Sequence, residues 1–326
     1  MDDGRTLVEH STIVIGLPCY NEERFLQRAI DSIKQQTWTD FVVLISDNAS
    51  TDGTGAIGER AALADPRFRY HRHDRNIGAS ENFNFVLEAS ESPFLVWLGG
   101  HDMIAPRFLE MHLAAMLADP RISLSYSRTG WIDENDEIVR LSMPTLDELS
   151  PRRLQRYVQA VMRIGECTPI NNMIRRDSLA ELRFGPVVAC DHVLLARLAY
   201  NGIFNVESEP LYLRRELAHE RQAYMERLTG QKDLKEDFRP LVDMYLQDFV
   251  RLRGADPLLP FTRRLLRVHV EKRFRLRRKG PLLHLVDRPL ILGWRMVDRA
   301  LTAFDRWRAA VGARVRGPRT GLQGSD

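Results

Sequence analysis

Apolar runs and amphipathic segments alternate along the first 120 residues. Segments 12–17, 41–45, 68–73 and 94–98 predict strands, and the first and last of these are apolar enough to be buried on both faces. Residues 22–36 carry apolar side chains at helical spacing, namely Phe25, Leu26, Ala29, Ile30 and Ile33. Strands that alternate with helices in this way predict an α/β fold, with a mostly parallel, Rossmann-like sheet covered by helices.

The alternation is less regular in the second half of the chain. The patterns there predict a strand at 122–127, a hairpin at 131–141, a helix at 150–163, a loop or short strand at 167–172, a helix at 191–201, and two short strands at 203–206 and 211–213. From about residue 221 the sequence is charged and predicts helices. This division favours an α/β domain over residues 1–225 and a helical, basic extension over residues 226–326.

Polar residues follow three of the predicted strands. Pro18-Cys19-Tyr20-Asn21-Glu22 follows the first strand, Asp47 to Thr54 follows the second, and Gly99-Gly100-His101-Asp102 follows the fourth. Ligands bind outside the carboxyl ends of the strands in open α/β sheets. The three segments therefore predict one ligand site, although each alone is compatible with an ordinary strand-turn-helix joint.

The charge of the chain is unevenly distributed. The formal net charge is +3, but residues 251–326 hold 19 Lys and Arg against 6 Asp and Glu, whereas the first 250 residues hold 28 against 38. This division argues against nucleic-acid binding along the whole chain and leaves an anionic surface as a partner for the C-terminal region.

The three cysteines, the N-terminus and the hydropathy favour a cytoplasmic protein. Cys19, Cys167 and Cys190 are widely spaced and form no CxxC pair, so reduced thiols are expected. The first ten residues are acidic and polar, unlike a signal peptide. No apolar run approaches the ~18 residues that would span a bilayer.

The string PCYNEERFLQRAIDSIKQQTW, followed by DFVVLISDNASTDGT, resembles the opening of the family 2 inverting glycosyltransferases. The resemblance covers roughly residues 11–220. It implies a GT-A fold and transfer of a sugar from a nucleotide-diphosphate sugar to an acceptor hydroxyl, with a divalent metal, Mg²⁺ or Mn²⁺, as cofactor. It also implies a glycan or lipid-linked acceptor, in the assembly of cell-surface polysaccharide or glycolipid.

The resemblance assigns the nucleotide sugar to residues at the first strand ends: Pro18, Tyr20, Glu22, Asp47, Asn48 and Arg75. Tyr20 would pack against the base, or alternatively cover the end of the sheet without contacting a ligand. Asn48 stands where the family commonly has a second acid that contacts the base. An amide both donates and accepts, so base binding is retained while the identity of the base is left open. Arg75 would reach the base or phosphate, or remain a solvated loop residue.

The metal motif of the family, an Asp-x-Asp or three consecutive acids, aligns with Gly100, His101 and Asp102. Asp102 is the member expected to ligate the divalent ion. One carboxylate can suffice because diphosphate oxygens and waters complete the coordination. His101 would ligate the metal or donate to the nucleotide sugar. The competing interpretation is a degenerate relative with weakened metal binding.

The resemblance also places a catalytic base at the start of a late helix, where Cys190-Asp191-His192 stands. Asp191 is the expected base, and a helix N-cap is its alternative role. His192 is expected to point away from a cleft that Asp191 faces. Arg214, Arg215 and His219 resemble basic residues that close over the diphosphate, although an exposed basic turn is also compatible with them.

The C-terminal region contains two basic amphipathic stretches, at 258–279 and 289–311, with Trp and Phe among the apolar positions. Such helices suit the surface of an anionic membrane, which would make the protein peripheral at the inner face of the cell membrane. Packing on the catalytic domain or on a partner subunit is the alternative. Two rival functions remain at this point: a non-catalytic nucleotide-sugar or glycan-binding relative, and a sugar nucleotidyltransferase.

Overall fold

A computed structural model describes residues 11–179, 182–185, 189–216 and 239–253, together with the single positions 264, 267, 299 and 303. The chain divides into two compact units, Met1–Asp237 and Phe238–Asp326. The predicted boundary at residues 225 and 226 lies outside the described residues, as do His219 and nearly all of the two basic stretches.

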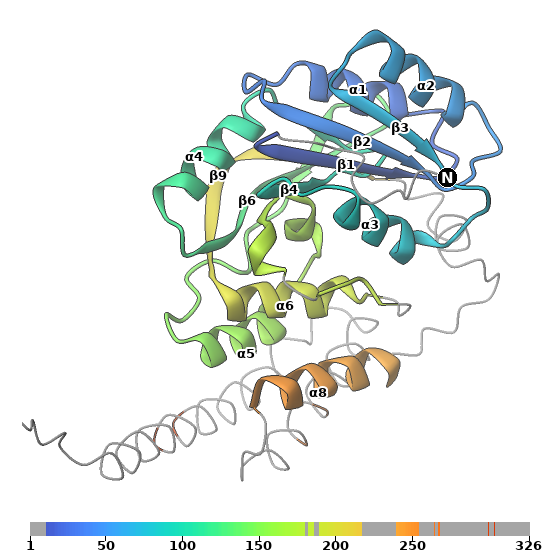
Figure 1. Ribbon diagram of the computed structural model, residues 1–326. Coiled ribbons are helices and arrows are strands. Elements are labelled where there is room, and N and C mark those ends of the chain that lie inside the picture. Colours follow the sequence, from blue (N-terminus) through green and yellow to red (C-terminus); the bar gives the residue numbers. More distant parts are fainter. Residues whose placement is uncertain are drawn as a thin grey trace, which may run out of the picture. The chain divides into compact units, whose positions relative to one another are not determined.

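The first half of the sheet is parallel, as the alternating pattern predicts (Figure 1). Four strands lie in the order β3-β2-β1-β4, and each pairs in parallel with its neighbours. The elements are β1 (Ile13–Cys19), α1 (Leu26–Lys34), β2 (Phe41–Asp47), α2 (Thr54–Ala64), β3 (Phe68–Arg72), α3 (Ala79–Glu88) and β4 (Phe94–Trp97). Since β1 lies between β2 and β4, its carboxyl end is at the middle of this parallel group.

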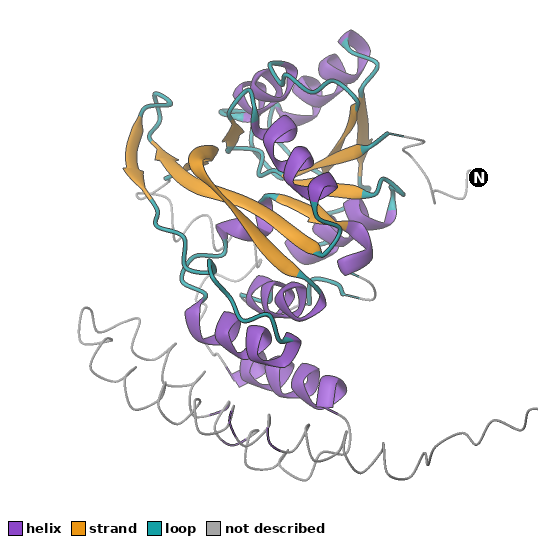
Figure 2. Cartoon of the chain, turned by 90° about the vertical axis from the view of Figure 1, so that its left-hand side faces the viewer, coloured by secondary structure: helices purple, strands orange, loops and turns teal. Residues whose placement is uncertain are grey.

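The second half of the sheet mixes parallel and antiparallel pairs. Its elements are β5 (Met103–Ile104), α4 (Phe108–Ala118), β6 (Ile122–Ile132), β7 (Ile138–Leu141), α5 (Arg153–Arg163), the 3-10 turn η1 (Thr168–Asn171), β8 (Met173–Arg175), the 3-10 turn η2 (Arg176–Ser178), α6 (Asp191–Asn201) and β9 (Ile203–Arg215). Beyond β4 the order continues β8-β6-β9-β5, with β7 paired to β6. Figure 2 shows the long strands of this half beside the helices.

Two predictions in this half need correction. The two short strands expected at 203–206 and 211–213 are parts of one strand, β9, which pairs with β6 on both sides of a register shift between Ser127 and Thr129. This register shift accommodates the polar residues that lie between the two apolar runs of β9. The segment 167–172 was predicted as a loop or a short strand. Most of it forms the 3-10 turn η1, so the strand alternative is wrong.

The two faces of β1 pack against different helices. Ile13, Ile15 and Leu17 are fully buried in a core shared with α1 and α4. Gly16 points to the other face, where α3 lies so close that a Cβ on Gly16 would be 1.9 Å from Cγ1 of Val86. This close approach holds the C-terminal half of α3 against the middle of β1.

The described part of the second unit is mainly α8 (Arg239–Arg253). Its buried positions, at helical spacing, are Leu241, Val242, Tyr245, Leu246 and Phe249. Asp243 forms an ion pair with Arg267, at 3.7 Å. Among the described residues, no helix combines the length and the apolar character that crossing a bilayer requires.

Candidate functional site

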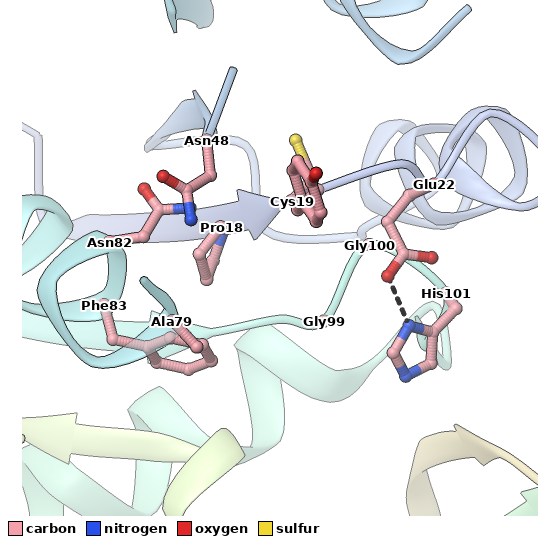
Figure 3. Close-up of a pocket in the computed structure, with 11 residues that line it drawn as sticks. Pro18, Cys19, Glu22, Asn48, Ala79, Asn82, Phe83, Gly99, Gly100 and His101 are labelled. Atoms are coloured by element: carbon pink, nitrogen blue, oxygen red, sulfur yellow. Dashed lines mark hydrogen bonds and ion pairs between the residues drawn. The ribbon is translucent and has the colours of Figure 1, made fainter. Parts of the chain in front are cut away.

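A pocket opens at the carboxyl ends of β1 and β4, beside the first turns of α3 (Figure 3). It is lined by Pro18, Cys19, Tyr20, Glu22, Asn48, Ala79, Asn82, Phe83, Gly99, Gly100 and His101. Five of the predicted donor-binding residues therefore lie together, from three segments that are far apart in the sequence. The structure places the pocket at the sheet edge where the strand-end motifs predict a ligand.

Asn48 is held in one orientation within this pocket. Its Oδ1 accepts the backbone N–H of Ile77 at 2.8 Å, and its Nδ2 donates to Oδ1 of Asn76 at 2.9 Å. Because a backbone N–H can only donate, the first bond fixes which end of the amide is oxygen. One Nδ2 hydrogen and one Oδ1 lone pair remain for a ligand.

Asp47, the neighbour of Asn48, does not line the pocket. Its carboxylate is fully buried and accepts hydrogen bonds from the Tyr70 hydroxyl at 2.7 Å, from Arg72 at 2.9 Å and from the Ser50 amide at 2.8 Å. Burial and the Asp47 carboxylate both raise the pKa of Tyr70, so this phenol remains a donor. Asp47 holds the loop in place, and this corrects its predicted contact with the nucleotide sugar.

Glu22 and His101 join the first and fourth strand ends. Oε1 of Glu22 lies 3.0 Å from Nδ1 of His101, as Figure 3 shows, and both side chains are nearly buried. Burial opposes a charge on this imidazole, but the carboxylates of Asp102 and Glu22 outweigh it and raise the pKa of His101. The pair therefore favours an imidazolium at the edge of the pocket.

Asp102 is held by two donors from β9. Its Oδ2 accepts the Tyr212 hydroxyl at 2.7 Å, and its Oδ1 accepts the backbone N–H of Arg215 at 2.9 Å. Nε2 of His101 lies 3.8 Å from the same Oδ1. Each carboxylate oxygen keeps one further lone pair, and an imidazole nitrogen is near. This donor set fits a small divalent cation such as Mg²⁺ or Mn²⁺.

Asp191 begins α6, directly after a short turn in which Ala189 has a φ of 63°. Burial raises the pKa of Asp191, although a hydrogen bond with the Cys167 thiol and one from the His192 amide, at 3.0 Å, act in the opposite direction. The side chains of Cys167, Asp191 and His192 have their potential ligand atoms within 4.8 Å of one another. His192 therefore lies beside Asp191, and its predicted orientation away from the cleft stays a prediction.

Arg214 contributes a positive charge near both ends of the site. Its guanidinium is 3.3 Å from Oγ1 of Thr168, and its positive charge acts on Asp191, on His101 and on Tyr212, the partner of Asp102. A cation in this position can attract an anionic ligand.

Arg215 faces the opposite way from Arg214. Its buried guanidinium donates to the carbonyl oxygens of His101 and Asp133 and lies over the ring of Phe25. These contacts correct its predicted role, because they occupy the side chain within the fold. Arg75 is exposed, and it forms no hydrogen bond or ion pair with the described residues.

The sequence did not single out the part of the pocket that comes from α3. Asn82 is buried and exchanges hydrogen bonds with Ser46, while Phe83 packs near Trp97 and Phe184. A signal was available, because Asn82 and Asn84 interrupt the buried face of an otherwise apolar helix. Tyr212 was missed because nothing in a short apolar strand marks its hydroxyl as a partner of Asp102.

The family model for "Glycosyl transferase family 2" matches residues 14–183, which is more than half of the chain. The chain belongs to glycosyl transferase family 2. The predicted resemblance is thereby confirmed, and the matched region contains the pocket and Asp102 but ends before Asp191.

Three curated relatives of this family 2 chain illustrate how far the similarity extends. An uncharacterized glycosyltransferase of Methanocaldococcus jannaschii is 27% identical over 134 residues, 40% of this chain and 46% of the relative. An uncharacterized protein of Mycobacterium tuberculosis is 39% identical over 85 residues, 26% of this chain and 25% of the relative. Chondroitin synthase of Escherichia coli is 26% identical over 137 residues, 42% of this chain and 20% of the relative. The chain thus matches less than half the length of each of these relatives.

The fold of this family 2 chain is shared with TarS of S. aureus. The crystal structure of TarS residues 1–349 in complex with UDP-GlcNAc superposes with a TM-score of 0.61 and 15% identity, covering 85% of this chain and 78% of that one. The predicted GT-A fold is confirmed.

Proposed function

We propose that this chain transfers a sugar from a nucleotide-diphosphate sugar to an acceptor hydroxyl, with inversion at the anomeric carbon. The observation that carries the proposal is the arrangement at the strand ends. A pocket at the carboxyl ends of β1 and β4 includes His101, the neighbour of Asp102, and the positive charge of Arg214 acts on His101 and on Asp191. Support also comes from the relatives named as glycosyltransferases and from TarS, whose structure contains UDP-GlcNAc.

The donor would bind with its base in the pocket and its diphosphate toward Asp102. Asn48 offers one donor and one acceptor to the edge of the base, and Tyr20 offers an aromatic face. Arg214 and the imidazolium of His101 would attract the diphosphate. An amide at Asn48 can pair with more than one base edge.

Asp102 would hold the divalent ion that the family implies, and His101 could join it as a ligand only after the imidazolium loses its Nε2 proton. When bound, a Mg²⁺ or Mn²⁺ ion neutralises charge that develops on the leaving diphosphate. The contribution of the chain is to fix the carboxylate through Tyr212 and the Arg215 amide, so that it need not reorient on binding.

Asp191 would act as the general base. The acceptor oxygen forms a bond to the anomeric carbon as the bond to the diphosphate breaks, and Asp191 takes the hydroxyl proton. Burial raises the pKa of Asp191 and makes it a stronger base than an exposed carboxylate. A single displacement of this kind inverts the anomeric carbon.

The wider role proposed for the chain is in cell-surface polysaccharide or glycolipid assembly on the cytoplasmic side of the membrane. The proposal is supported by the predicted basic amphipathic stretches, which suit lipid-linked acceptors.

Replacing Asp191 with Asn tests the proposed reaction. The amide cannot accept the proton, so we expect the transfer rate to fall by roughly 10²–10⁴. Donor affinity, measured by calorimetry, should be retained because Asp191 lies away from the base pocket. Asp177→Asn, at an exposed aspartate, serves as the control and should keep full activity.

The rival functions predict different results in the same assays. A binding-only relative would bind a sugar nucleotide without turnover for any acceptor, and a nucleotidyltransferase would instead form sugar nucleotide from sugar phosphate and nucleoside triphosphate. A thermal-shift screen of sugar nucleotides with and without Mn²⁺ identifies the donor. Equal stabilisation in both conditions would rule out the metal role given to Asp102.

A further inference from the structure

Cys167, Asp191 and His192 form a cluster that the proposed transfer reaction does not require as a whole. Cys167 immediately precedes η1, whereas Asp191 and His192 are the first two residues of α6. One potential ligand atom from each residue lies within 4.8 Å of the other two. His192 is buried, and Cys167 and Asp191 are partly buried, so the three are held among packed elements.

We infer that these three side chains form a binding site for a thiophilic divalent cation, with Zn²⁺ the best fit. A sulfur, an imidazole nitrogen and a carboxylate oxygen are typical zinc ligands, and three protein ligands leave a fourth position open. The site is distinct from the pair of His101 and Asp102, which offers only nitrogen and oxygen and suits Mg²⁺ or Mn²⁺.

The geometry needs only a small adjustment to close around an ion. With Zn–S near 2.3 Å and Zn–N or Zn–O near 2.0–2.1 Å, tetrahedral ligand atoms lie about 3.3–3.6 Å apart. The present separations of at most 4.8 Å therefore need to shorten by no more than about 1.5 Å.

The charges of the cluster match a divalent cation. Binding breaks the S–H bond of Cys167, forms the bond between sulfur and the ion, and releases one proton to solvent. The thiolate and the Asp191 carboxylate then carry two negative charges. Arg214 and the N-terminus of α6 oppose the cation, so the site should be weaker than a structural zinc site with several thiolates.

Titration of the full-length protein with Co²⁺ tests the inference. Cobalt bound by a thiolate gives a ligand-to-metal charge-transfer band in the near ultraviolet, which a site made only of nitrogen and oxygen ligands cannot give. We expect a band that saturates at one equivalent and that added Zn²⁺ removes.

The chain offers matched controls, because it has three cysteines. Cys167→Ser should abolish the band, whereas Cys19→Ser and Cys190→Ser should retain it. His192→Gln and Asp191→Asn should lower the Co²⁺ affinity by about tenfold or more. Circular dichroism of each variant verifies that it is folded. Absence of the band from the wild type, or its survival in folded Cys167→Ser, would overturn the inference.

An ion bound to Asp191 would occupy the carboxylate that the proposed transfer uses as its base, so the cation-bound protein should be inactive in transfer. The two proposals can still fail separately. If Asp191→Asn abolishes transfer while the wild type shows no cobalt band, the function stands and the metal site is wrong. If the band behaves as expected while Asp191→Asn transfers sugar normally, the site stands and the catalytic role of Asp191 is wrong.

Discussion

Asp102 owes its orientation to Tyr212 and to the backbone of Arg215. The hydroxyl of Tyr212 is buried, and both burial and the Asp102 carboxylate raise the pKa of this phenol, so it donates at any physiological pH. Without this bond the carboxylate would be held at one oxygen only. The side chain of Tyr212 thus serves as a positioning group for the proposed metal ligand.

We expect Tyr212→Phe to lower the affinity for Mn²⁺ by roughly 10–100-fold, the usual effect of losing an outer-shell partner. The measurement is the Mn²⁺ concentration that gives half-maximal stabilisation of the donor complex. Tyr126→Phe removes an equally buried hydroxyl away from the pocket and should leave this concentration unchanged. If the wild type and Tyr212→Phe need the same Mn²⁺ concentration for half-maximal stabilisation, Tyr212 does not position the proposed metal ligand.

His112 makes the stability of the protein sensitive to acid. The side chain is fully buried beside Phe108, its Nδ1 lies 2.8 Å from the Ser125 hydroxyl, and burial lowers its pKa to about 3. Below about pH 6.5 the unfolded state binds a proton that the folded state does not. The free energy of unfolding therefore falls as pH decreases from about 6.5 toward 3, by about 1.4 kcal/mol per pH unit.

We predict that His112→Asn reduces this loss. Asn keeps a polar atom near Ser125 but does not titrate, so thermal midpoints measured at pH 7 and pH 5 should differ less in the variant than in the wild type. A difference of about 1–2 kcal/mol corresponds to several degrees, at roughly 2–4 °C per kcal/mol. If the thermal midpoints of the wild type and the variant change equally with pH, His112 is not the group that causes the loss of stability in acid.

Neighbouring residues with different roles show what the sequence could not reveal. Asp47 and Asn48 were both predicted to contact the donor, and so were Arg214 and Arg215. Adjacent side chains in extended backbone point in opposite directions, so one member of each pair reaches the site and the other packs inside the fold. The choice depends on register and on distant partners such as Tyr70 and Phe25, which no local pattern specifies.

Among the elements, the strands and helices of the first half of the chain could be predicted from the sequence, because they alternate regularly. Strands β1, β2 and β4 are short and buried, and the helices α1, α2 and α4 follow them along the chain, as the alternating pattern predicts. The second half contains β9, whose apolar runs are separated by polar residues at an irregularity in its pairing with β6. A local pattern cannot show that such a strand continues.

The packing of α3 on β1 gives a prediction for these elements. Gly16→Ala places a methyl group 1.9 Å from Cγ1 of Val86, and the stiff Val side chain cannot turn away freely. We expect a loss of about 1–3 kcal/mol in the free energy of unfolding, which thermal or urea unfolding would detect.

Two further variants test the cause of that loss. Gly165→Ala, whose added methyl would lie 3.5 Å from Thr145, should be nearly neutral. Val86→Ala combined with Gly16→Ala should recover part of the stability, because it removes the closest atom. A double variant no more stable than Gly16→Ala would show that the strain lies elsewhere.

At the scale of the whole molecule, the sequence carries opposite charges in its two parts. Residues 251–326 have a formal net charge of +13, and the first 250 residues have one of −10. A polybasic segment gains about 1 kcal/mol per Lys or Arg near an anionic membrane, within a Debye length. The basic stretch at 258–279 is the most concentrated part of this charge.

We predict that the full-length protein sediments with anionic vesicles at low salt and is released as the salt concentration rises. Replacing Arg277, Arg278 and Lys279 with Gln should weaken this binding at every salt concentration, whereas neutral vesicles should bind neither protein. Failure to sediment with anionic vesicles at low salt would end the membrane hypothesis.

The bond between the Arg215 amide and Asp102 also offers a spectroscopic reporter that requires no label on a side chain. A backbone proton that points at a carboxylate oxygen is sensitive to any change in the electron density of that oxygen. The ¹⁵N–¹H resonance of Arg215, and its rate of exchange with D₂O, should therefore change when Asp102 gains a ligand. Cation occupancy could thus be followed from the main chain of β9 before any donor sugar is identified.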